Sequence, residues 1–157
     1  MTVTGSDVIL LAHSTFGVFG TMSALWVFVE TLNAREENSG RIRTAAVAVA
    51  LCMIATWILG GYWYIHFYPF DKELILNGPW PFAHTLFMET KEHLVIILLL
   101  LTTYLPIAAS NELVANKDAR KLVLWTSGII PLLGLLIEGH GAIIAMGVKV
   151  ALLAKQI

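Results

Sequence analysis

Residues 44–66 read TAAVAVALCMIATWILGGYWYIH, and this stretch decides the fold because it contains no Asp, Glu, Lys or Arg. A helix rises 1.5 Å per residue, so about 20 apolar residues cross the ~30 Å hydrocarbon core of a bilayer. The stretch is long enough to do this. It therefore predicts a membrane-spanning helix.

Three further apolar stretches, 8–32, 94–109 and 122–154, surround the first. The one at 94–109 reaches span length if its helix begins near Ala83. Overall, 57% of the residues are hydrophobic and 13% are charged. We expect an all-α integral membrane protein, a four-helix up-down bundle. It would form a single transmembrane domain, 1–157, with helices at about 8–32, 44–68, 83–109 and 122–154. Gly128 and Pro131 offer a place for the last helix to kink.

The positive charges predict an orientation. Every Arg, together with Lys117 and Lys121, falls in the first and third connections, and only scattered Lys residues fall on the opposite side. The positive-inside rule then places both termini on the side of the membrane that faces away from the cytoplasm. The membrane itself is expected to be the inner (cytoplasmic) membrane. Residues 1–7 contain no Lys or Arg, so we expect no signal peptide and expect the first helix to stay in the mature protein. A net charge of -1 and the absence of a basic stripe argue against a nucleic-acid partner and leave membrane lipid as the expected environment.

Histidines are the most informative polar residues of the chain. With the predicted topology, all five lie toward the side of the membrane that holds the termini. An ionisable side chain inside a membrane is a functional-site hypothesis by default, because it is costly to bury. The five are His13, His66, His84, His93 and His140.

A b-type haem is one centre that these histidines could hold, since two imidazoles on facing helices are its usual axial ligands. His13 and His93 match in depth on helices that lie diagonally in a simple bundle. His140 is the alternative second ligand, and His84 is a further cofactor-binding candidate. Gly17 follows His13 by one turn, where a small residue would either admit a flat macrocycle or allow close helix packing.

A non-haem iron, copper or zinc site is the competing interpretation. Imidazole and carboxylate suit these metals, and Glu89 with His93 has the spacing that places two ligands on one helix face. His13, His140 and His66 would complete the metal ligands. The chain has no Glu-x-x-His pair, which argues against a carboxylate-bridged di-iron centre.

Glu138 is the candidate catalytic residue. It lies in an apolar helix two positions before His140, so the two side chains point to different faces. A glutamate in this setting could relay a proton, contact a quinone or pair with a cation.

In its architecture the chain resembles small four-helix membrane cytochromes b, through His13, His93, His140 and the glycines near them. The resemblance implies a haem b electron-transfer protein, acting alone or as a subunit of a respiratory complex, with its centre near the extracytoplasmic side and a possible link to quinol. The chain departs from the two-haem kind, because no histidine lies in the cytoplasmic half.

Two other functions remain open from the sequence. The first is a metal-binding membrane protein, either an oxidase or a metal-handling subunit. The second is a structural subunit without a cofactor, with other membrane subunits or further copies of itself as partners. Whether the protein is an enzyme, as an oxidoreductase component would be, is also left open.

Overall fold

The structure is a computed structural model that describes residues 4–156, and this part of the chain is helical without strands. Four segments are long and apolar enough to span a membrane, so the expected all-α membrane class is confirmed at that level. The elements are α1 (Gly5–Leu32), α2 (Glu36–His66), α3 (Tyr68–Leu76), η1 (Ala83–Met88), α4 (Glu89–Ala109) and α5 (Lys117–Ala154). The π-helix η1 runs directly into α4, and together they form the third long segment, Ala83–Ala109.

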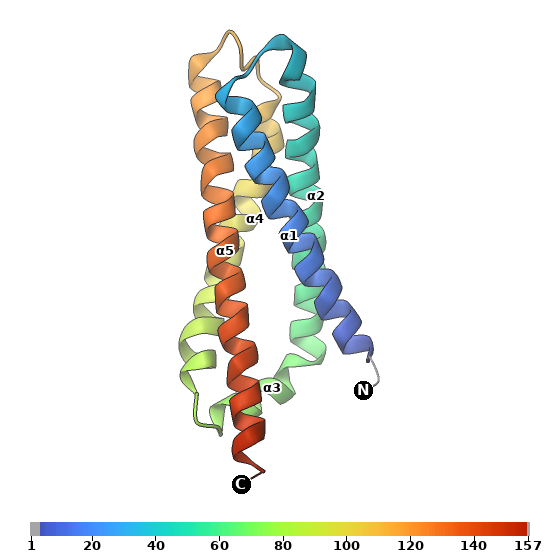
Figure 1. The fold of residues 1–157 in the computed structure, drawn as a ribbon, viewed down its shortest axis with the longest axis vertical. Helices are drawn as coiled ribbons and strands as arrows, with labels where there is room; N and C mark the ends of the chain where they lie inside the picture. The colour runs from blue at the N-terminus through green and yellow to red at the C-terminus, as the bar shows by residue number, and fades with distance from the viewer. Residues whose placement is uncertain (1–3, 157) are drawn as a thin grey trace.

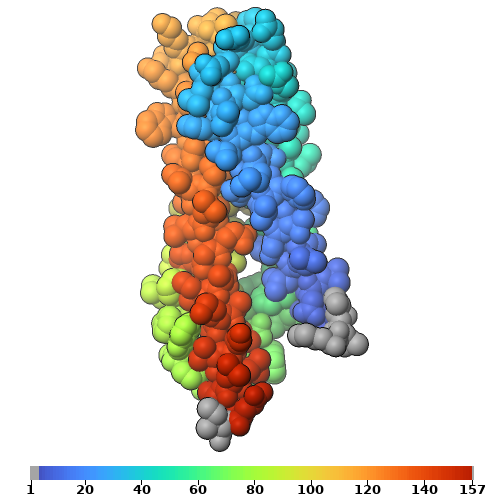
Figure 2. Space-filling model, in the orientation of Figure 1, coloured from blue at the N-terminus to red at the C-terminus, as the bar shows by residue number. Residues whose placement is uncertain are grey.

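Both termini lie at one end of the molecule, called here the terminal end, and the α1–α2 and α4–α5 connections lie at the other, the loop end (Figure 1). Helix α1 packs against α2 and α5, and α4 packs against the same two helices from the other side. The four long helices therefore surround a common interior. Figure 2 shows the surface hollowed between α1 and α5 in the half nearer the termini.

Helix boundaries differ from the apolar stretches because hydropathy marks the membrane portion and not the whole helix. Helix α2 begins at Glu36 rather than at residue 44, and its first turn carries two glutamates, which favour a helix N-terminus. Helix α5 begins at Lys117, where the Asn116 side chain accepts from the backbone N–H groups of Asp118 and Ala119. It continues as one helix of 38 residues through Pro131.

The half of the bundle nearer the loop end contains a dense apolar core. Small side chains bring the helices together there, as is common for helix pairs in membranes. Fully buried members of this loop-end core are Ala24, Val27, Ile42, Ala46, Val49, Leu105, Val123 and Ile130. The buried hydroxyls of Thr31, Thr102 and Ser127 donate to carbonyls of their own helices, so the contacts between helices in this half are mainly apolar.

At the terminal end, α3 and η1 pack against α5 and form a second, smaller cluster that includes Tyr68, Ile75, Ala83 and Ile144. Gly147 allows this contact, because a Cβ there would lie 2.7 Å from the Ala83 methyl. The loop between α2 and the third span is thus folded onto the bundle. The aromatic residues that surround it suit the membrane interface.

Candidate functional site

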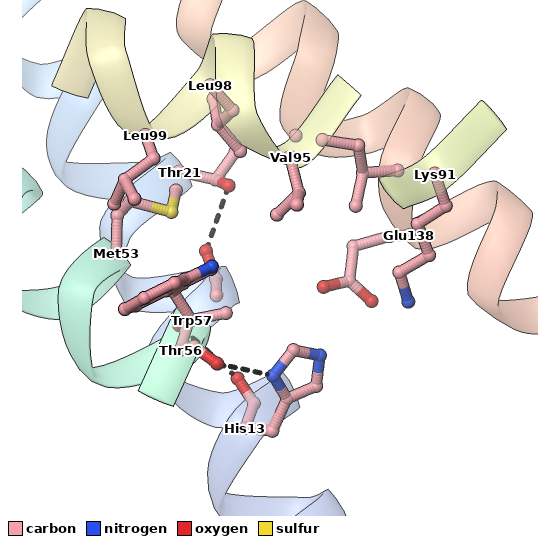
Figure 3. Close-up of a pocket in the computed structure, with 13 residues that line it drawn as sticks. His13, Thr21, Met53, Thr56, Trp57, Lys91, Val95, Leu98, Leu99 and Glu138 are labelled. Atoms are coloured by element: carbon pink, nitrogen blue, oxygen red, sulfur yellow. Dashed lines mark hydrogen bonds between the residues drawn. The ribbon is translucent and has the colours of Figure 1, made fainter. Parts of the chain in front are cut away.

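An internal cavity of about 40 Å³ lies between the four long helices, on the terminal-end side of the loop-end core. Figure 3 shows most of its lining side chains. Most of them are apolar, and the polar exceptions come from all four helices. The lining residues are His13, Gly17, Thr21, Met53, Thr56, Trp57, Lys91, Val95, Leu98, Leu99, Gly134, Ile137 and Glu138.

His13 is held in place by α2. Its Nδ1–H donates to the backbone carbonyl of Thr56 at 2.8 Å, and the Thr56 hydroxyl donates back to the His13 carbonyl at 3.4 Å. The imidazole lies against Gly60, where a Cβ would stand 2.6 Å from the His13 Cε1. Because Nδ1 is bonded to the backbone, the tautomer is fixed and Nε2 is the nitrogen available to the cavity. In Figure 3 it turns toward Glu138 and Lys91.

Glu138 enters the cavity from α5 and Lys91 enters it from α4. Each lies beside a glycine that leaves it room: a Cβ at Gly17 would come within 3.0 Å of the Glu138 Oε1, and one at Gly141 within 3.2 Å of the Lys91 Nζ. The two groups interact through space, yet no direct ion pair within 4 Å joins them in the described part of the chain. Three ionisable groups from three helices therefore face one cavity.

His93 does not reach this cavity. It follows Lys91 by two residues, which turns it about 200° around the helix at 3.6 residues per turn. Its side chain is exposed, and its Nδ1–H donates to the Glu89 carbonyl one turn earlier at 2.6 Å. Glu89 is exposed as well. The structure therefore does not bring His13 and His93 together as a facing pair.

The remaining histidines lie elsewhere. His140 donates from Nδ1 to the Leu136 carbonyl at 2.7 Å, and its ring packs edge-on against Phe87. His66 is exposed at the end of α2, with its ring centroid 4.3 Å from that of Tyr62. His84 is buried beneath α3, where it bonds Tyr68.

Of the residues predicted from the sequence, His13 and Glu138 are thus the two that the structure places at this cavity. Within residues 4–156, no group of three or more His, Cys, Asp or Glu is arranged to hold a metal ion. The metal and haem assignments rest on the sequence patterns and stay predictions.

Lys91 is an ionisable cavity residue that the sequence analysis did not place among the candidate site residues. A signal for it existed: Lys91, Val95 and Leu98 have the i, i+4, i+7 spacing of one helix face, and all three line the cavity. A charged residue on the same face as two core positions is expected to point inward. The inward direction of Lys91 was not predicted because the residue lies near Glu89, Glu92 and His93 at the start of a span, where charged side chains usually face the interface.

Comparison with known proteins gives no relative: no family model, curated protein or solved structure matches this chain. A functional proposal therefore rests on the geometry of the cavity.

Proposed function

We propose that this protein exchanges protons inside the membrane, at a site formed by His13, Lys91 and Glu138. The observation that carries the proposal is that these three ionisable side chains, from three helices, face one internal cavity. Ionisable residues inside a membrane protein commonly mark proton relays or ligand sites. The fixed tautomer of His13 leaves Nε2 as a proton acceptor, and Glu138 and Lys91 each have a protonated and an unprotonated form.

The size of the cavity favours water as its content. A water molecule needs roughly 10–15 Å³ of such space, so about 40 Å³ holds about three. Sites for organic ligands are usually larger, from ~300 Å³ upward. Water in contact with three ionisable groups supplies the hydrogen-bonded links through which protons move.

Access to the site is proposed to be one-sided. The loop-end core separates the cavity from the loop end with fully buried aliphatic residues such as Val27, Val49 and Leu105. Toward the terminal end, the surface is hollowed between α1 and α5 (Figure 2). Protons would therefore enter and leave from the terminal end, and the protein would not conduct them across the membrane.

The membrane arrangement is part of the same proposal. We place the four long helices across an inner membrane in up-down order, with the terminal end on the extracytoplasmic side. The arginines support this orientation, because Arg35, Arg41, Arg43 and Arg120 all lie near the loop end. The site would then exchange protons with the extracytoplasmic medium.

Infrared difference spectroscopy of the purified protein between acid and alkaline pH tests the proposal. We expect a carboxylic-acid band from a membrane-buried glutamate that disappears in Glu138→Gln. Glu112→Gln, at an exposed position in the α4–α5 connection, should leave the band unchanged. A spectrum that is the same in Glu138→Gln and wild type would reject the proposed site.

Reconstitution into vesicles containing a pH-sensitive dye tests the one-sided access. With potassium and valinomycin to balance charge, we expect no steady proton flux in response to a pH step. A flux that depends on Glu138 would contradict one-sided access.

A haem-bearing or metal-bearing redox subunit is the second candidate, and one contact of His13 favours it. Histidines that ligate metals usually donate their other ring N–H to a carbonyl or carboxylate, and His13 donates Nδ1–H to the Thr56 carbonyl. In that case Nε2 would be the ligand atom, and quinone and other redox subunits would be the partners. An absorption spectrum of oxidised and reduced protein, compared with His13→Ala, decides: a haem band lost in the variant supports the assignment, and a featureless spectrum rejects haem.

A further inference from the structure

Tyr68 and His84 form a buried pair that the proton site does not use. Tyr68 is 1% exposed and His84 is 4% exposed, and the Tyr68 Oη lies 2.9 Å from the His84 Nδ1. The pair joins the first residue of α3 to the π-helix η1. Single π-helical turns within helices often occur at functional sites.

The phenol is the donor in this hydrogen bond. Among residues 4–156, the Tyr68 hydroxyl has no other hydrogen-bond partner. If His84 donated instead, the phenolic proton would be left without an acceptor in a buried position, which is rare and costly. His84 Nδ1 is therefore an unprotonated base that already holds the tyrosine proton in a hydrogen bond.

Aromatic rings connect this pair with the surface. Tyr64 stacks on Tyr68 with ring centroids 5.2 Å apart and an interplanar angle of 21°, and the ring centroid of Trp63, the preceding residue of α2, lies 5.9 Å from that of Tyr68. The Tyr64 side chain is exposed. An electron leaving Tyr68 thus has a short path through stacked rings to the outside of the molecule.

We infer that Tyr68 is a redox-active tyrosine that loses an electron to an outer-sphere one-electron oxidant while its phenolic proton passes to His84. The oxidant is a metal centre of a protein or complex at the terminal end. In this step the O–H bond of Tyr68 breaks and an N–H bond forms at His84 Nδ1, which gives a neutral tyrosyl radical and an imidazolium. The oxidant gains one electron. When the electron and the proton return to Tyr68, the phenol is restored.

The surroundings support a coupled transfer. Burial raises the pKa of Tyr68 above its usual range, so the phenol does not lose its proton before oxidation. Burial and the nearby Lys72 disfavour an imidazolium at His84, and the carboxylates of Glu89 and Glu92 offset these effects in part. The inference does not depend on the proton site, because no Tyr68 or His84 atom lines that cavity.

Flash oxidation of the full-length protein with photo-oxidised ruthenium tris-bipyridine tests the inference. Electron paramagnetic resonance should show a tyrosyl radical that outlives those of exposed tyrosines, because solvent and quenchers cannot reach it. The long-lived signal should disappear in Tyr68→Phe and remain in Tyr104→Phe, at an exposed position in the loop-end half of α4. The same long-lived signal in Tyr68→Phe would overturn the inference.

His84→Gln separates the role of the base from that of the packing. Glutamine can accept the hydrogen bond but cannot take the proton, so we expect a large loss of radical yield. Circular dichroism must show that Tyr68→Phe and His84→Gln remain helical. Tyr64→Phe, which keeps the stacked ring, is a second control beside Tyr104→Phe. If the yield of the long-lived radical in His84→Gln equalled that of wild type, in both heavy and ordinary water, His84 would not be the proton acceptor.

Discussion

Substitution of Gly60 by alanine is the most direct test of the way in which the fold positions His13. A Cβ at Gly60 would lie 2.6 Å from the His13 Cε1 and 2.7 Å from its Nδ1. Carbon atoms in ordinary contact are ~3.5–4.0 Å apart, so the imidazole must move by about 1 Å. The 2.8 Å bond from Nδ1–H to the Thr56 carbonyl does not survive such a shift.

The neighbouring Gly61 provides the control, because a Cβ there meets nothing within 4 Å. Both substitutions gain the helix propensity of alanine over glycine, up to about 1 kcal/mol, and this gain cancels in their comparison. Only Gly60→Ala leaves the half-buried donor of His13 without its acceptor, which costs up to about 1–3 kcal/mol. We therefore expect Gly60→Ala to be less stable than Gly61→Ala by about 1–3 kcal/mol.

Two measurements check this expectation. Unfolding in mixed micelles, followed by circular dichroism, gives the free-energy difference between the two variants. Nitrogen-15 NMR of labelled histidines shows whether the Nδ1–H of His13 keeps its bond. Equal stability of the two variants, with that proton still protected, would refute the proposed packing of His13 and with it the fixed tautomer.

Three further outcomes are expected from contacts elsewhere in the fold. Gly147→Ala should loosen α5 from η1, because its Cβ would lie 2.7 Å from the Ala83 methyl, whereas Gly139→Ala meets nothing within 4 Å and should be neutral in a thermal-unfolding comparison. Burial raises the pKa of Asp71, so its contribution to stability is present at low pH and is lost as pH rises through the folded-state value. Asp71→Asn should therefore be more stable than wild type at neutral pH, which unfolding measured at several pH values would show. Equal stability of the two proteins at neutral pH would mean that the Asp71 carboxyl is well solvated. Arg120→Gln should lower stability by about 0.5–1.5 kcal/mol, because the guanidinium donates to the last turn of α1 at 2.7 Å, and chemical denaturation at high and low salt would measure it.

The sequence was sufficient to predict the helices that could span a membrane, because apolar stretches of this length have few alternatives. The third span, 83–109, agrees with the structure, and the start of α2 was placed too late. Solvent-side turns such as the one at Glu36 carry no hydropathy signal. Their capping residues would have marked the boundary better than the apolar pattern did.

The site was harder to predict, because the depth of a residue in a membrane does not fix the direction of its side chain. His13 and His93 were paired by depth alone, and the helical phase of α4 separates them: position 91 faces inward and position 93 faces outward. Helical phase was available from the sequence through Val95 and Leu98. Contacts such as the one between Tyr68 and His84 were not, because they depend on how α3 folds back onto the bundle.

The positions of the polar groups give the two halves of this bundle different roles. In the loop-end half, fully buried alanine and valine side chains pack the helices closely. In the terminal-end half, Gly17, Gly60 and Gly141 lie directly beside the three ionisable side chains, so these three glycines make room for functional groups, whereas Gly147 makes room for η1. Alanine at any of these glycines should therefore alter proton exchange or the position of its neighbour. Alanine at Gly128, which would only tighten a contact with Phe28 at 3.3 Å, should change stability without affecting the Glu138 infrared band.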